Sequence, residues 1–144
     1  MTTRWTLLGG LALLWGAACA DTDAPTSIQL DRGLVPADAI TCFGFAATIV
    51  GTDAGETIQG TPGNDVIHAM GGDDTVFGNG GRDVICGGDG DDRLYGSNKS
   101  DRIDTGEGAN VAEGGAGNDR IVGGMGPDTL RGGSGKDQLD GAAG

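Results

Sequence analysis

Residues 87–95 read GGDGDDRLY, and this nine-residue pattern runs ten times from residue 51 to residue 140 without an insertion or a deletion. The sixth residue of every unit carries a side-chain oxygen, and the eighth is aliphatic. Such internal repeats determine the architecture, because each unit is a small element that stacks on its neighbours. A flexible glycine-rich linker is the alternative interpretation, but a linker has no reason to place an aliphatic residue at every ninth position.

The units resemble the nonapeptides of the hemolysin-type calcium-binding family, also called RTX repeats. Residues 87–95 and 114–122 match the family pattern Gly-Gly-x-Gly-x-Asp-x-U-x, in which U is aliphatic, at each defined position. The resemblance implies an all-β fold, a right-handed parallel β-roll (β-solenoid) of about five turns with two units per turn. The last three residues of a unit would form a short strand and the first six a loop. Independently, a three-residue strand with an aliphatic middle residue turns that one side chain inward.

The resemblance also implies that several calcium ions (Ca²⁺) bind between loops that lie one turn apart. Calcium takes about six to eight oxygen ligands from carboxylates and carbonyl groups, and the sixth position supplies the carboxylates. These positions fall into a first column (residues 65, 83, 101, 119 and 137) and a second column (residues 56, 74, 92, 110 and 128). The expected ligands are Asp65, Asp74, Asp83, Asp92, Asp101, Asp119, Asp128 and Asp137.

The expected sites differ in strength. Two columns of five loops leave four gaps each, which sets an upper limit of eight ions between loops. Three loops are weaker: the Glu56 loop has Ala54 in place of glycine, Lys99 brings a cation into the Asp101 loop, and Asn110 is uncharged. We expect the strongest sites between residues 65 and 83, 74 and 92, and 119 and 137.

Composition is consistent with a cation-binding chain. The 144 residues include 21 acidic and 9 basic residues, for a formal net charge of −12, and only three Phe, two Trp and one Tyr. This balance argues against a nucleic-acid partner. An acidic chain with few aromatic residues is typical of disorder, so we expect this single domain to fold when its carboxylates are neutralised.

The first twenty residues predict an export signal. Arg4 precedes an apolar stretch from Leu7 to Trp15, which is too short for a comfortable membrane span. Cleavage after Ala20 would give a secreted protein without a transmembrane segment, whereas a lipobox reading attaches a lipid at Cys19. Residues 21–41 are interpreted as a linker.

In an exported chain, Cys42 and Cys86 are predicted to form a disulfide, with two free thiols as the alternative. Bridging needs Cα atoms within about 7 Å, so the residues after Cys42 would have to fold back along the solenoid. Residues 42–50 fit one further unit, a metal-free N-terminal cap with Ala47 at the ligand position. Phe43 and Phe45 are expected to cover the open end of the core, ahead of the repeat domain at 51–140 and a tail at 141–144.

No catalytic constellation is visible in the sequence. The single histidine, His68, falls at an outward ninth position, and no nucleophile pairs with it. The sequence therefore predicts an exported, non-enzymatic calcium-binding protein that folds on binding extracellular calcium. The alternative is a calcium-stabilised module that binds polysaccharide or a cell-surface component, for which Phe77, Tyr95 and outward arginines offer only a partial stripe.

Overall fold

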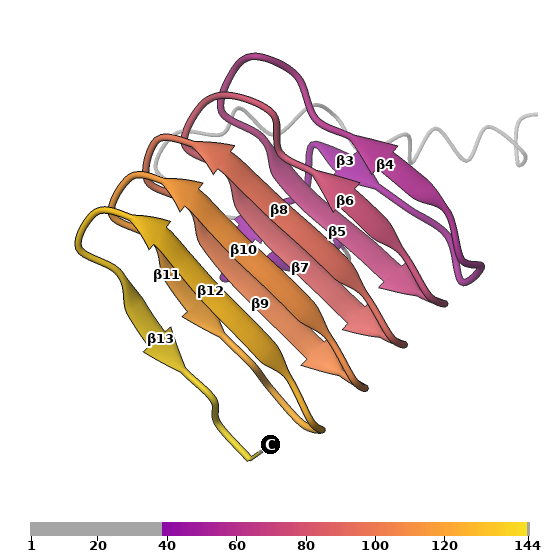
Figure 1. The fold of residues 1–144 in the computed structure, drawn as a ribbon. Coiled ribbons are helices and arrows are strands. Elements are labelled where there is room, and N and C mark those ends of the chain that lie inside the picture. The colour runs from indigo at the N-terminus through magenta and orange to yellow at the C-terminus, as the bar shows by residue number, and fades with distance from the viewer. Residues whose placement is uncertain (1–38, 144) are drawn as a thin grey trace, which may run out of the picture. The chain divides into compact units, whose positions relative to one another are not determined.

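The computed structural model describes residues 39–143, which form thirteen β-strands and no helix (Figure 1). The export signal, the lipid attachment at Cys19 and most of the linker expected from the sequence lie outside the described residues. Within residues 39–143, no helix has the length and apolarity that a membrane crossing requires.

The chain coils between two parallel sheets that face each other (Figure 1). Each strand pairs with the strand one turn later, and partners such as Ile67 and Ile85 lie eighteen residues apart. The expected β-solenoid of about five turns, with two units per turn, is confirmed. The six-stranded sheet has the order β13 (Gln138–Asp140), β11 (Arg120–Val122), β9 (Arg102–Glu107), β7 (Val84–Asp89), β5 (Val66–Gly71), β3 (Ile49–Val50). The five-stranded sheet has the order β12 (Thr129–Ser134), β10 (Val111–Ala116), β8 (Arg93–Asn98), β6 (Thr75–Phe77), β4 (Thr57–Gln59).

Several strands are longer than the three residues expected. Strand β8, for example, continues from Arg93 to Asn98, and its pairing with β10 extends to Asn98 and Ala116. The register omits Gly96 and Gly114, the first residues of their units, and resumes at the second residue. Backbone pairing therefore also uses the second and third residues of a unit, and only the fourth to sixth residues form the tight turn.

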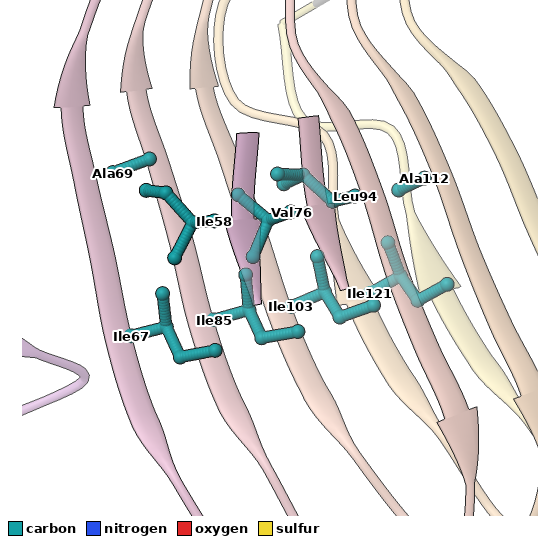
Figure 2. Packing of buried hydrophobic residues seen from close by; sticks show 9 residues of the cluster. All are labelled: Ile58, Ile67, Ala69, Val76, Ile85, Leu94, Ile103, Ala112 and Ile121. Carbon is teal, nitrogen blue, oxygen red and sulfur yellow. The ribbon is translucent and has the colours of Figure 1, made fainter. Parts of the chain in front are cut away.

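The hydrophobic core is a double row of eighth-position side chains (Figure 2). Alternation along each short strand points the middle residue between the sheets. The described side chains of this double row have exposed fractions of 7 % or less and are Ile58, Ile67, Val76, Ile85, Leu94, Ile103, Ala112 and Ile121. Ala69, the first residue of its unit, is buried beside them. Ile49 and Leu130 extend the rows at the two ends. Each buried aliphatic side chain contributes only about 1.5 to 3 kcal/mol, so a stack of this width leaves the roll thinly stabilised.

The segment before the repeats forms a hairpin of β1 (Thr41–Cys42) and β2 (Phe45–Ala46). Its two turn residues, Phe43 and Gly44, both have a positive φ, as a type I′ hairpin turn requires. The predicted disulfide is confirmed: Cys42 is fully buried and bonded to Cys86 in β7, with the two Cα atoms 5.7 Å apart. The hairpin thus folds back over the six-stranded sheet.

The expected position of Phe43 and Phe45 was wrong. Both rings lie against the Arg102 guanidinium in β9, with its central carbon 4.4 Å and 5.9 Å from the two ring centroids, and not over the open end of the core. The disulfide directs the hairpin along the outer face of the sheet, where a cation–π contact is available. Only β3, through Ile49, extends the solenoid as the additional unit predicted.

Candidate metal centre

The sixth-position side chains form two hydrogen-bonded ladders, one along each column. In the first column the backbone N–H of Asp83 donates to Oδ1 of Asp101 at 2.8 Å, and the N–H of Asp101 donates to Oδ1 of Asp119 at 2.9 Å. The same bond joins each described neighbour, namely 65 to 83, 119 to 137, 56 to 74, 74 to 92, 92 to 110 and 110 to 128. At the sixth position, each loop is therefore tied to the next one through one carboxylate or amide oxygen.

The second carboxylate oxygen is what distinguishes these aspartates from ordinary structural ones. Oδ2 is buried and has no hydrogen-bond partner in Asp74, Asp83, Asp92, Asp101, Asp119 and Asp128. A buried charged oxygen without a partner is strongly unfavourable. Six such atoms at corresponding positions of the two columns therefore fit a ligand of positive charge.

Two expected ligands differ from this set. Asp65 accepts hydrogen bonds at Oδ2 from the backbone N–H and the hydroxyl of Thr61, at 2.7 Å and 2.9 Å. Asp137 is only partly buried in the last turn, and its Oδ1 accepts the N–H of Asp119. Both residues take the expected place in the first column, but neither is among those with a buried, unpartnered oxygen.

The first residue of a unit leaves space beside this oxygen. A Cβ atom added at Gly78 would lie 2.5 Å from Oδ2 of Asp83 and 2.9 Å from the carbonyl oxygen of Gly96, one turn later. A side chain there would displace these atoms, so glycine keeps open a small cradle that is lined by a carboxylate and a carbonyl oxygen. The role of this position was not anticipated, although its recurrent glycine is visible in the sequence.

Backbone conformation separates the first two loops from the others. The second and fourth residues of every unit from the third to the tenth have a positive φ, such as 110° and 128° for Gly88 and Gly90. In the sixth unit these positions are Ser97 and Lys99, at 87° and 76°, where a side chain costs conformational energy. The loops at 51–56 and 60–65 have no positive φ at their second or fourth residues. These two loops therefore have a different shape.

Burial shifts the protonation of the ladder carboxylates. Desolvation raises the pKa of Asp101 to about 7 and that of Asp83 and Asp92 to about 6, although the ladder hydrogen bond acts in the opposite direction. Desolvation by burial also raises the pKa of Asp74 and of Asp119. The nearest carboxylates of the column add to the increase by repulsion. The charged ion-free site is therefore unfavourable at neutral pH, and a bound cation would relieve both burial and repulsion.

The oxygen-only chemistry of these sites limits what they can hold. In residues 39–143 no group of three or more His, Cys, Asp or Glu side chains lies close enough to hold a metal ion. An ion would therefore need backbone carbonyl groups in addition to the aspartates, which suits a hard cation such as calcium. His68 does not contribute: its Nδ1 accepts the N–H of Met70 at 3.1 Å, and burial lowers its pKa.

The outer surfaces of the two columns carry opposite charge. In residues two to five of each unit, the loops of the first column contain basic but no acidic residues, and those of the second contain acidic but no basic residues. The basic residues are Arg82, Lys99 and Lys136, and the acidic residues are Asp53, Asp73, Asp89, Asp91 and Glu107, all exposed. A shallow groove of about 520 Å³ follows the first-column edge, with Arg82, Lys99, Ser100 and Asn118 in its lining.

Comparison with known proteins agrees with this geometry. A family model described as the RTX calcium-binding nonapeptide repeat (four copies) matches residues 50–85, 87–121 and 113–144. No curated protein and no solved structure matches the chain.

Proposed function

Since the chain belongs to the RTX calcium-binding nonapeptide repeat family, we propose that it is an exported, non-enzymatic β-roll whose folding is completed by extracellular calcium. Family membership implies calcium binding in the roll. The observation that carries the dependence of folding on calcium is the set of buried Oδ2 atoms without a partner, which occur in both columns.

The proposed ligands are the ladder aspartates together with backbone carbonyl groups of adjacent loops. The six aspartates with an unpartnered Oδ2 are the principal candidates, and Asp65 and Asp137 complete the ends of the first column. When bound, calcium would supply the positive charge that offsets carboxylate burial. The chain itself supplies the ladder that sets the carboxylates in register and the glycine cradles that admit an ion.

The thin core supports a dependence of folding on calcium. Ordering the backbone costs about 1 to 2 kcal/mol per residue, whereas a nine-residue unit buries at most one eighth-position side chain in the double row. Buried carboxylates with raised pKa values oppose the ion-free fold further. Binding to the folded state alone then stabilises it in proportion to the logarithm of ligand concentration. Export is supported by the Cys42–Cys86 disulfide, because such bonds persist in oxidising compartments.

Calorimetry and circular dichroism of the disulfide-bonded chain test this proposal. In chelator the chain should have a largely disordered spectrum, and excess calcium should produce a β-rich spectrum with a saturable heat of binding. Magnesium should substitute poorly, because it retains its waters and requires a tight octahedron. A β-rich spectrum in chelator, with no heat on calcium addition, would contradict the proposal.

A second candidate function is binding of an anionic polysaccharide. The binding surface would be the groove along the basic edge, where Arg82 and Lys99 lie together beside polar side chains, and not the pair of aromatic rings. The rings of Phe77 and Tyr95 instead stack on each other, with centroids 5.0 Å apart and planes at 10°, so each uses one face on its neighbour. A glycan-binding screen with the Arg82→Ala/Lys99→Ala double variant should show loss of acidic-glycan binding, whereas Phe77→Ala should retain it.

A further inference from the structure

The seventh unit, residues 105–113, departs from the repeat at two positions that face the interior. Its first residue is Thr105 where the open cradles have glycine, and its sixth is Asn110 where the ladder otherwise carries a carboxylate. Both side chains are fully buried, with exposed fractions of 0 % and 1 %. Ala69 and Glu56 are the other departures at these two positions, but each occurs alone in its unit.

The ladder determines which way the Asn110 amide is oriented. Its Oδ1 accepts the backbone N–H of Asp92 at 2.8 Å, as a carboxylate oxygen does in the other turns. The amide nitrogen therefore occupies the position of the unpartnered Oδ2, and it donates to the carbonyl oxygen of Gly108 at 3.4 Å. In the flanking aspartates of the same column, Asp92 and Asp128, Oδ2 is buried without a hydrogen-bond partner.

Thr105 fills the cradle of the same turn. The hydroxyl of Thr105 donates to the carbonyl oxygen of Gly123, one turn later. This carbonyl corresponds to that of Gly96, which lies beside the open cradle at Gly78. In the seventh unit, the amide N–H group of Asn110 thus takes the place of a carboxylate oxygen. The carbonyl oxygen that could bind an ion accepts the hydroxyl of Thr105. Donor groups directed into a cavity repel a cation.

We propose that Thr105 and Asn110 replace calcium in this turn, so that the second column binds no ion between residues 110 and 128. The inference rests on the proposed function and specifies which turns of the roll bind calcium. The first column, with glycine at the first position of all five units, has no such interruption. The second column is interrupted by a turn held by protein hydrogen bonds, which does not depend on calcium.

The Thr105→Gly/Asn110→Asp double variant restores the repeat and tests this inference by ion counting. Native mass spectrometry and calorimetry should give more calcium ions per chain than for the wild type, and the ion-free variant should be less structured. Ala109→Asp is the matched control, because it adds the same charge at the exposed adjacent residue and should leave the ion count unchanged. Thr105→Ser keeps the hydroxyl and should also retain the wild-type count.

An unchanged ion count in the double variant would overturn the inference while leaving calcium binding by the wild type intact. Absence of calcium binding in both chains would overturn the proposed function as well. A crystal structure of the wild type grown in calcium decides the matter without any variant. It should contain ions in the first column and none between residues 110 and 128, and an ion in that gap would refute the proposal.

Discussion

The backbone N–H of Asp83 donates to Oδ1 of Asp101 at 2.8 Å, although the residues are eighteen positions apart, while Oδ2 of each carboxylate is buried without a partner. One oxygen of the side chain therefore joins two turns, and the other remains available for a ligand. The two roles can be separated experimentally, because an amide retains the first oxygen and replaces the second.

Asp101→Asn should reduce the number of bound calcium ions and increase the stability of the ion-free fold. The amide retains the acceptor for Asp83 but removes a buried negative charge whose neutralisation calcium would otherwise provide. Ion counting and thermal unfolding with and without calcium measure both effects. Asp91→Asn is the control, since Asp91 is exposed and its oxygen only accepts the N–H of Ala109. Equal behaviour of the two variants would contradict the assigned role of Oδ2.

The ion-free chain should become more structured as the pH falls. Burial raises the pKa of Asp101 to about 7 and of Asp83 and Asp92 to about 6, so the folded state binds more protons than the unfolded state. The resulting destabilisation is fully present above the raised values and disappears as the pH falls towards the ordinary aspartate pKa of about 4. Circular dichroism of metal-free protein should therefore show more β-structure at about pH 5 than at about pH 8. No change, or the reverse, would argue against buried charged carboxylates.

Loss of the disulfide should destabilise the calcium-bound fold by about 4 kcal/mol, the chain-entropy value for a loop of this length. The Cys42→Ser/Cys86→Ser variant removes the bond across a sequence separation of 44 residues and releases the hairpin from β7. The calcium concentration at the folding midpoint should rise accordingly. Arg102→Gln separates the contribution of the disulfide from that of the arginine, because it removes only the cation–π contacts with Phe43 and Phe45. An unchanged midpoint in the double variant would show that the hairpin contributes nothing to folding.

Gly96→Ala should weaken calcium binding at the Asp101 turn. The added Cβ would contact Oδ2 of Asp101 and lie 2.7 Å from the carbonyl oxygen of Gly114, so it would occupy the cradle. Calorimetry should detect a loss of affinity or of one class of sites. Gly141→Ala is the control, because no atom lies within 4 Å of a Cβ at that position. If Gly96→Ala binds calcium like the wild type, then the cradle is not part of the site.

Much of the roll is predictable because its contacts recur at a constant separation. An aliphatic residue at every ninth position requires equivalent strands, and the two units per turn that the family resemblance implies place residue 67 beside residue 85 and Asp83 beside Asp101. The disulfide partners were also predictable, since Cys42 and Cys86 are the only cysteines after the expected signal. The repeat length therefore identifies the neighbours in the roll, and the small number of cysteines identifies the disulfide partners, without coordinates.

The differences among the repeats required the coordinates. Asp65 and Asp83 are the same residue type at the same position, but the Thr61 hydroxyl and N–H occupy the free oxygen of one and nothing occupies that of the other. The hairpin lies over Arg102 because a non-periodic segment can take any path that its disulfide allows. Sequence spacing determines which turns meet, because every turn has the same length; which oxygen atoms remain unpartnered depends on side-chain contacts that only folding brings together.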